Sequence, residues 1–197
     1  MGDAVIDCST VREPFRVLVV CTGNLHRSPL AERLLTSRLA SASGKFRVSS
    51  AGTAAVNGTP MDPVAAALLT EMGGDPAGAT ARRLTAATVS AAALVLGAAT
   101  EHREAAVRLR PVHGLGRAFT LREFARLLHE DDAAGLTDPA ERAAALTRGA
   151  AARRGVSGGG RWDDDLVDPY GASEGEARAC AARITEAVER IAAAVLG

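Results

Sequence analysis

Apolar and polar residues follow one another in blocks along this chain, and the spacing within each block predicts strands and helices in turn. Short, continuously apolar runs rich in β-branched residues are typical of strands buried on both faces. We expect such strands at residues 15–20, 45–53, 92–98 and around 112–119. Amphipathic spacing and helix-start signals predict helices at residues 29–40, 63–72, 100–109, 120–130 and 173–196. Because strands alternate with helices, we expect a parallel sheet covered on both faces.

Polar residues at the expected helix starts define the boundaries further. Ser28 is a candidate N-cap for a helix that begins at Pro29, a favoured first helical residue. Asp62 has the same role for the next helix, which Gly73 ends. Capping boxes are expected at the starts of two later helices, formed by Thr120 with Glu123 and by Ser173 with Glu176.

The length of 197 residues suits a single domain with a full hydrophobic core. We expect residues 1–14 to form a loose N-terminal tail and residues 15–197 to form that domain. Residues 131–161 interrupt the alternation of strands and helices, so we expect a variable, partly flexible segment there. Its first part can be helical, but its end, "GVSGGGRW", has the composition of a linker.

Composition and charge exclude several classes of partner. The net charge is zero and no basic stripe is interleaved with aromatic residues, so we expect no nucleic-acid partner. No apolar run approaches the length of a membrane span and the first residues do not resemble a signal peptide, which favours a cytoplasmic protein. Lys45 is the only lysine beside many arginines and alanines, a usage that hints at a GC-rich bacterial genome. The three cysteines, Cys8, Cys21 and Cys180, are too few and scattered for a disulfide framework or a zinc site.

The stretch "VLVVCTGNLHRSPLAERLL" carries the candidate chemistry. Cys21 ends the first buried strand, and ligands of open α/β sheets bind at the carboxyl ends of strands. The following loop leads into a helix N-terminus, whose free N–H groups and dipole favour an anion. Gly23 permits a tight or left-handed turn that lets successive N–H groups converge. Arg27 can grip two oxygens of a phosphate with its planar fork.

The same positive features would stabilise a thiolate on Cys21, and Ser28 can donate a further hydrogen bond to its sulfur. The loop therefore predicts a nucleophile and a dianion site in one place. The alternatives are that Cys21 is a small buried apolar residue and that Arg27 is a solvated side chain. A cation beside the positive end of a helix is misplaced unless an anion lies between them, which favours the phosphate interpretation.

Five motifs then occur in an order that resembles the low-molecular-weight protein tyrosine phosphatases. They are "VLVVCTGNLHRSPLAE", "VSSAGT", "GTPMDPVA", "ARRLT" and "DPYG". The resemblance spans most of residues 16–196 and is weakest across 131–161. It implies an α/β, flavodoxin-like, three-layer sandwich around a four-stranded parallel sheet, with no metal and no cofactor.

By this resemblance Cys21 attacks phosphorus, Arg27 clamps the equatorial oxygens and Asp168 protonates the leaving oxygen. A phosphocysteine mechanism independently needs an acid outside the loop, although an Asp-Pro pair is also common in turns and caps. Ser50 resembles the residue that, with the loop asparagine, holds the loop in shape. The expected substrate-binding residues are Thr22, Gly23, Asn24, Leu25, His26, Ser28 and Tyr170.

Several positions depart from the family pattern. His26 stands where many members have a second cysteine, so no disulfide can form inside the loop, and Cys8 and Cys180 are the remaining candidates to replace it. Val56 and Gly171 replace aromatic residues and leave Tyr170 as one wall of the substrate pocket. Bracing residues of the family are also replaced, by Ala79, Ala98 and Ala99.

The expected function is hydrolysis of phosphomonoesters through a phosphocysteine. The substrate is either a phosphotyrosine protein or a small metabolite such as a nucleotide or sugar phosphate, with Arg161 and Trp162 as possible contacts folded over the site. Reduction of arsenate is an alternative, but only with an external thiol, because no cysteine lies within residues 80–95. A non-catalytic phosphate-binding module is the third interpretation, since a fold alone does not establish activity.

Overall fold

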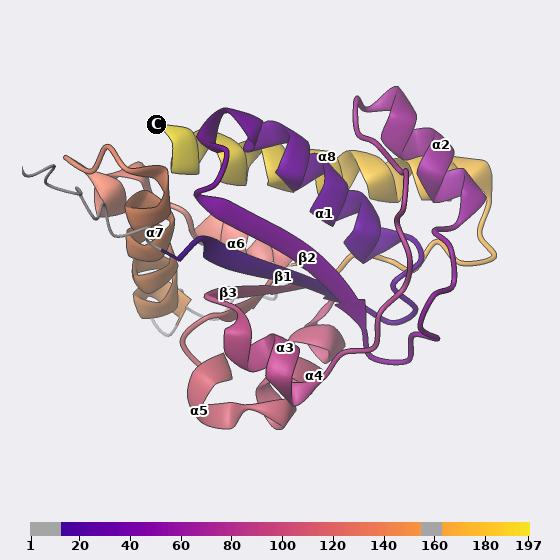
Figure 1. The fold of residues 1–197 in the computed structure, drawn as a ribbon, viewed down its shortest axis with the longest axis horizontal. Coiled ribbons are helices and arrows are strands. Elements are labelled where there is room, and N and C mark those ends of the chain that lie inside the picture. Colours follow the sequence, from indigo (N-terminus) through magenta and orange to yellow (C-terminus); the bar gives the residue numbers. More distant parts are fainter. Residues whose placement is uncertain (1–12, 155–162) are drawn as a thin grey trace, which may run out of the picture.

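The structure, a computed structural model, describes residues 13–154 and 163–197. At its centre is a parallel sheet of four strands in the order β2-β1-β3-β4 (Figure 1). The strands are β1 Phe15–Cys21, β2 Phe46–Gly52, β3 Leu94–Gly97 and β4 Ala118–Thr120. The predicted parallel sheet is therefore confirmed, and its strands all end at the same edge.

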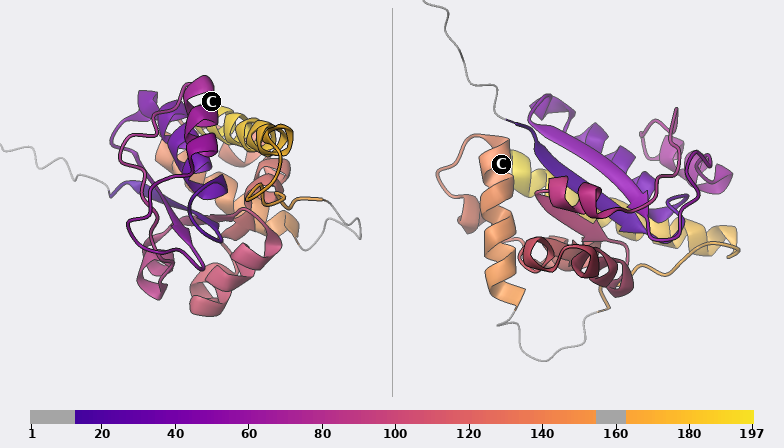
Figure 2. Two further views of the ribbon diagram at one scale, coloured as in Figure 1. Left: turned by 90° about the vertical axis from the view of Figure 1, so that its right-hand side faces the viewer. Right: turned by 60° about the horizontal axis from the view of Figure 1, so that its bottom comes forward.

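Helices cover both faces of this sheet, which gives the three predicted layers (Figures 1 and 2). The helices α1 and α8 lie on one face together with α6, and α3 and α4 lie on the other. The helices are α1 Arg27–Arg38, α2 Pro63–Glu71, α3 Ala86–Ala91, α4 Thr100–Leu109, α5 Pro111–Gly114, α6 Leu121–Leu127, α7 Pro139–Arg154 and α8 Glu174–Leu196. Within the described ranges, none of these helices is both long enough and apolar enough to span a membrane.

Side chains that alternate along β1 supply two separate cores. Val17 and Val19 pack into the larger core with α1 and α8, whereas Leu18 and Val20 pack into a smaller core with α3 and α4. Successive side chains of a strand point to opposite faces, so a continuously apolar β1 fills both layers. The central position of β1 fixes the end of that strand, Cys21, in the middle of the sheet edge.

Local capping signals predicted several boundaries correctly. Asp62 accepts hydrogen bonds from the N–H groups of Val64 and Ala65 and caps α2. The capping boxes expected at the starts of α6 and α8 are both present. Each of these contacts joins residues within four positions of one another, so the local sequence is enough to predict it.

Other expectations were wrong in detail. The first helix begins at Arg27, and its N-cap is His26, which makes no side-chain capping bond, so Ser28 is not the cap. The strand expected around 112–119 is the shorter β4, preceded by the helical turn α5. The helix α3 was not expected at all. The sixteen-residue helix α7, by contrast, lies in the first part of residues 131–161, where the sequence allowed a helix.

Candidate active site

Cys21 is the last residue of β1, where the loop to α1 begins, and it is buried. Its sulfur accepts a hydrogen bond from the main-chain N–H of Asn24 at 3.2 Å, and the hydroxyl of Ser28 lies 2.9 Å away. Ser28 Oγ also accepts an N–H from the Asn24 amide at 2.9 Å, which leaves the hydroxyl hydrogen to point at the sulfur. Two hydrogen-bond donors therefore point at the Cys21 sulfur, as expected of a cysteine that acts as a nucleophile rather than as an inert core residue.

The left-handed turn of this loop falls on Asn24, which has a φ of 56°, and not on Gly23 as expected. Three hydrogen bonds of its side-chain amide hold this conformation. The nitrogen donates to Ser28 Oγ and, at 2.7 Å, to Ser50 Oγ, while the oxygen accepts from the main-chain N–H of Arg82 at 2.8 Å. Asparagine tolerates positive φ better than most residues, so the loop shape depends on this side chain.

Arg27 extends from the first turn of α1 with only 4% of its surface exposed. Its Nη1 donates to the carbonyl of Leu166 at 3.0 Å, and its Nη2 lies 2.5 Å from Asp168 Oδ2. The segment that carries Asp168 is held to the sheet edge, because the N–H of Leu166 donates to the carbonyl of Ala98 at 2.8 Å. The structure thus brings Arg27 and Asp168 together from positions 141 residues apart.

The loop is also supported from β2. Ser50 donates its hydroxyl to the carboxylate of Glu32, which forms an ion pair with Arg82. At the strand end, the N–H groups of Thr53 and Ala54 each donate at 2.9 Å to the carbonyls of residues 21 and 22. The sequence pattern did not indicate Glu32 or Arg82, because each is an ordinary charged residue until the fold places it beside this network.

Gly52 lies where β2 passes closest to the loop. A Cβ on this residue would be 2.5 Å from the carbonyl oxygen of Thr22 and 2.9 Å from the N–H nitrogen of Asn24. These neighbours are main-chain atoms, so a side chain here must displace the loop itself.

We therefore expect Gly52→Ala to lower the free energy of unfolding by about 1–3 kcal/mol, the usual cost of overpacking, and to weaken inorganic phosphate binding. Chemical denaturation and calorimetric titration measure the two effects. Gly116→Ala is the matched control, because a Cβ at Gly116 meets nothing within 4 Å. Equal behaviour of the two variants would show that the loop accommodates the methyl group.

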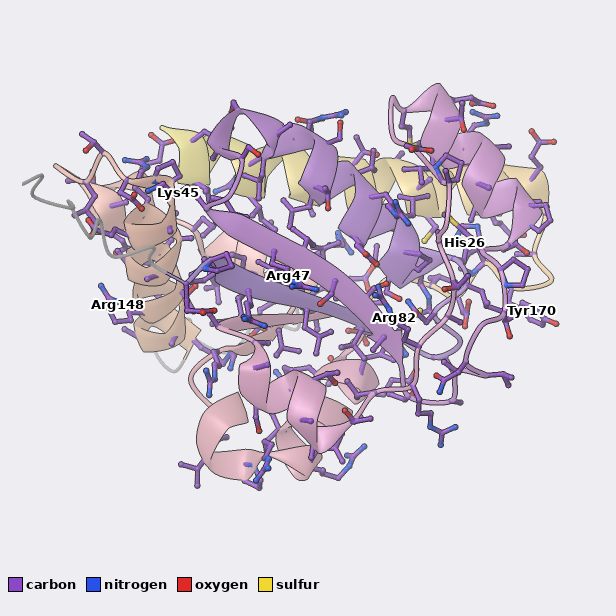
Figure 3. The ribbon with its side chains drawn as sticks, in the orientation of Figure 1. His26, Lys45, Arg47, Arg82, Arg148 and Tyr170 are labelled. Atoms are coloured by element: carbon purple, nitrogen blue, oxygen red, sulfur yellow. The ribbon has the colours of Figure 1, made fainter. Side chains whose placement is uncertain are left out.

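A groove of about 700 Å³ opens beside the loop, between the start of α2, the start of α8 and the turn at residues 169–172. Leu25 and His26 form its wall on the loop side. Tyr170, 81% exposed, lies on the opposite side, and its N–H donates to Asp168 Oδ1 at 3.3 Å. Figure 3 shows His26 and Tyr170 at the end of the molecule toward which the strands point.

Comparison of the sequence with known protein families identifies the family of this chain. A model of the family described as low molecular weight phosphotyrosine protein phosphatase matches residues 16–149, more than half of the chain. The chain belongs to this family.

Two curated phosphatases match part of this family member. The probable low molecular weight protein-tyrosine-phosphatase EpsP of Ralstonia nicotianae is 42% identical over 80 residues, which cover 41% of this chain and 52% of EpsP. The low molecular weight protein-tyrosine-phosphatase Etp of Escherichia coli K12 is 40% identical over 86 residues, which cover 44% of this chain and 55% of Etp. The chain thus spans about half the length of the curated relatives it matches.

A solved structure extends the likeness over nearly the whole phosphatase fold. The YwlE arginine phosphatase from Geobacillus stearothermophilus superposes with a TM-score of 0.66 at 27% identity, and the match covers 91% of this chain and 92% of that one. The flavodoxin-like sandwich of the low molecular weight phosphatases is therefore confirmed for this chain.

Some residues that depart from the family pattern have clear positions. Cys180, on α8, is buried and donates to the carbonyl of Val167 at 3.5 Å, and burial raises the pKa of its thiol to about 11. Val56 is 73% exposed. Three other residues considered above, Cys8, Arg161 and Trp162, lie outside the described residues. In the part of the chain that the structure describes, no group of three or more His, Cys, Asp or Glu side chains is arranged to hold a metal ion.

Two buried histidines flank the loop of this phosphatase family member. His26 is 8% exposed, and within the described residues neither of its ring nitrogens has a hydrogen-bond partner. His102, at the start of α4, is 1% exposed and was not predicted as part of the site. Burial lowers the pKa of both imidazoles in the folded protein.

The lowered pKa values predict a loss of stability in acid. An unfolded histidine takes up a proton below about pH 6.5, whereas the folded ones do so only at lower pH. The free energy of unfolding should therefore fall as pH drops below about 6.5, and should be unaffected by these groups above it. Urea denaturation at several pH values measures this slope. His102→Gln removes one of the two buried imidazoles and should reduce this slope; an unchanged slope in that variant would contradict the prediction.

Proposed function

We propose that this chain is a cysteine-dependent phosphomonoester hydrolase that works through a phosphocysteine. The observation that carries the proposal is the convergence of three groups at the sheet edge. The Cys21 sulfur is surrounded by donors, Arg27 is buried within the same loop, and Asp168 reaches the Arg27 fork from a distant segment. A nucleophile, a phosphate clamp and a proton donor are the parts that a phosphocysteine mechanism needs.

The reaction has two displacements. The Cys21 thiolate attacks phosphorus, an S–P bond forms, and the ester P–O bond breaks while Asp168 gives its proton to the leaving oxygen. Water then attacks the phosphocysteine, Asp168 accepts the proton of that water, and the S–P bond breaks to release inorganic phosphate. Substrate has to take over the Arg27 fork from the Asp168 carboxylate, and the released carboxylate takes up from water the proton that it then gives to the leaving oxygen.

A phosphotyrosine protein is the substrate class that we propose, in preference to a small metabolite. The groove beside Leu25 and His26 combines an apolar surface with the charged pair Glu71 and Arg178, so it suits residues that flank a phosphotyrosine in a polypeptide. The names of EpsP and Etp point the same way. A reducing bacterial cytoplasm is the proposed setting, because a free thiolate nucleophile persists there.

A substrate screen tests this function. We expect purified protein to hydrolyse p-nitrophenyl phosphate and to favour phosphotyrosine peptides, by kcat/KM, over nucleotide and sugar phosphates. A phosphoarginine peptide belongs in the panel because YwlE carries that activity in its name. A metabolite that exceeds every peptide would overturn the substrate class.

The same screen separates the two other functions. Arsenate supplied with small thiols should not be reduced; turnover there would identify an arsenate reductase. A chain that binds inorganic phosphate tightly but hydrolyses no ester would be a phosphate-binding module, and the phosphatase proposal would fail.

A further inference from the structure

His102 touches the phosphate loop with one ring nitrogen and the main chain of its own helix with the other. Its Nδ1 lies 3.0 Å from the N–H nitrogen of Ala99, and its Nε2 lies 2.9 Å from the hydroxyl oxygen of Thr22. Because the Ala99 N–H is a donor, Nδ1 must accept and cannot carry a hydrogen. The neutral ring therefore has its hydrogen on Nε2 and donates it to Thr22.

This donation settles what the Thr22 hydroxyl can do. Its oxygen also lies 3.4 Å from Nη2 of Arg27, whose guanidinium can only donate. The oxygen thus accepts from His102 and faces Arg27, so its own hydrogen is directed away from both. Thr22 is the residue after Cys21, and the main chain at Thr22 is held by the bond from Ala54.

We propose that His102 is a positioning residue of the phosphate site: it holds the Thr22 hydroxyl so that the hydroxyl hydrogen is donated to the bound phosphoryl group. The Thr22 oxygen also accepts from Nη2 of Arg27 and so restrains that end of the guanidinium. This role deepens the proposed phosphatase function and rests on it.

The packing around His102 fits a fixed, neutral ring. A Cβ on Gly97 would lie 3.2 Å from the Cβ of His102 and 2.7 Å from the N–H nitrogen of Arg103, so Gly97 packs closely against the start of α4 beside the histidine. A proton on Nδ1 would meet the Ala99 N–H head-on.

Charged groups face this ring from three sides. Arg27 approaches from α1 and opposes protonation, and Asp165 and Asp168 approach from the segment before α8 and favour it. Glu101, on α4 itself, places Oε1 3.4 Å from Nε2 and is the competing acceptor. Burial outweighs the carboxylates and lowers the pKa of His102.

A double-mutant cycle on p-nitrophenyl phosphate tests the role. We expect Thr22→Val and His102→Leu each to lower kcat/KM about tenfold, the size of coupling typical of groups in contact. The double variant should be no worse than the poorer single variant, because His102 acts through the hydroxyl. Losses that multiply to about a hundredfold would overturn the proposal.

Two further variants keep the test decisive. His102→Gln retains an acceptor for Ala99 and an N–H for Thr22, so it should recover part of the activity that His102→Leu loses; it also replaces that variant in the cycle if His102→Leu fails to fold. Glu101→Gln is the matched control and should leave kcat/KM unchanged. A loss in Glu101→Gln as large as in His102→Leu would make Glu101 the partner of the ring and overturn the role of Thr22.

Nitrogen-15 NMR of the histidine rings reads the tautomer directly. The His102 signal is the one that is missing in the His102→Gln variant. It should come from a neutral ring with its hydrogen on Nε2, and the Thr22→Val substitution should shift it. A ring with its hydrogen on Nδ1 would overturn the proposal. If the wild-type chain hydrolyses no ester, the proposed function fails. The same cycle measured on the dissociation constant of inorganic phosphate still tests His102.

Discussion

Cys21→Ser should abolish hydrolysis of every phosphomonoester, with a loss on the order of 10⁴–10⁶-fold, as when other enzymes lose their nucleophile. A serine hydroxyl needs a base to become a nucleophile at neutral pH. The groups that touch the Cys21 sulfur are the Asn24 N–H and the hydroxyl of Ser28, and both act as donors there. Neither of these groups can take a proton from a serine, so the loop supplies no base for a hydroxyl nucleophile.

Kinetics on p-nitrophenyl phosphate measure this loss, and calorimetric binding of inorganic phosphate shows whether the loop still folds. Cys180→Ser is the matched control, because Cys180 is also buried but lies on α8 against the carbonyl of Val167. It should retain near-native turnover. Substantial turnover by a folded Cys21→Ser variant would remove the thiolate from the mechanism.

The features that sequence predicted well are those whose physical cause is local. The apolar run of β1, the Asp62 cap and the capping box at the start of α8 each depend on residues within one short segment. The prediction of an anion site in the loop from Cys21 to Arg27 also rests on local features, namely a strand end, a helix start and an arginine.

The features that sequence missed depend on partners far along the chain. The Asn24 amide oxygen accepts from the main-chain N–H of Arg82, which lies 58 residues further along the chain. The contact of His102 with Thr22 spans 80 residues, and no local spacing encodes it. A histidine five residues after the end of β3 was the available signal, and it has no meaning until β1 and β3 are known to be neighbours.

The family resemblance named Asp168 as the acid, and Asp163, Asp164 and Asp165, which precede it in the sequence, are the alternative carboxylates. Two of these carboxylates have structural partners. Asp164 pairs with Arg126 at 2.6 Å, and Asp165 accepts from the N–H of Thr100 at 2.7 Å. Of the four, Asp168 is the one that pairs with Arg27, at 2.5 Å, and 48% of its side chain is exposed. It can therefore reach both the substrate and water.

Asp168→Asn should slow the hydrolysis of alkyl phosphates roughly 10²–10⁴-fold, the usual worth of a general acid, and should slow p-nitrophenyl phosphate far less. An alkoxide needs a proton as it leaves, whereas p-nitrophenolate is stable without one. Asp165→Asn is the matched control, because it removes a carboxylate three residues before Asp168. Any loss of activity in this variant should be the same for alkyl phosphates and for p-nitrophenyl phosphate.

Binding of inorganic phosphate gives an independent reading of the same variant. In the structure the Asp168 carboxylate occupies Nη2 of Arg27, the group that should hold the phosphate. Replacing this anion by a neutral amide removes both a competitor and a repulsive charge, so phosphate should bind more tightly to Asp168→Asn than to the native chain. Equal losses on alkyl and aryl esters together with weaker phosphate binding would mean that Asp168 only holds Arg27 in place. Leaving-group dependence together with tighter binding requires a carboxyl group that gives up Arg27 to the substrate and then delivers its proton.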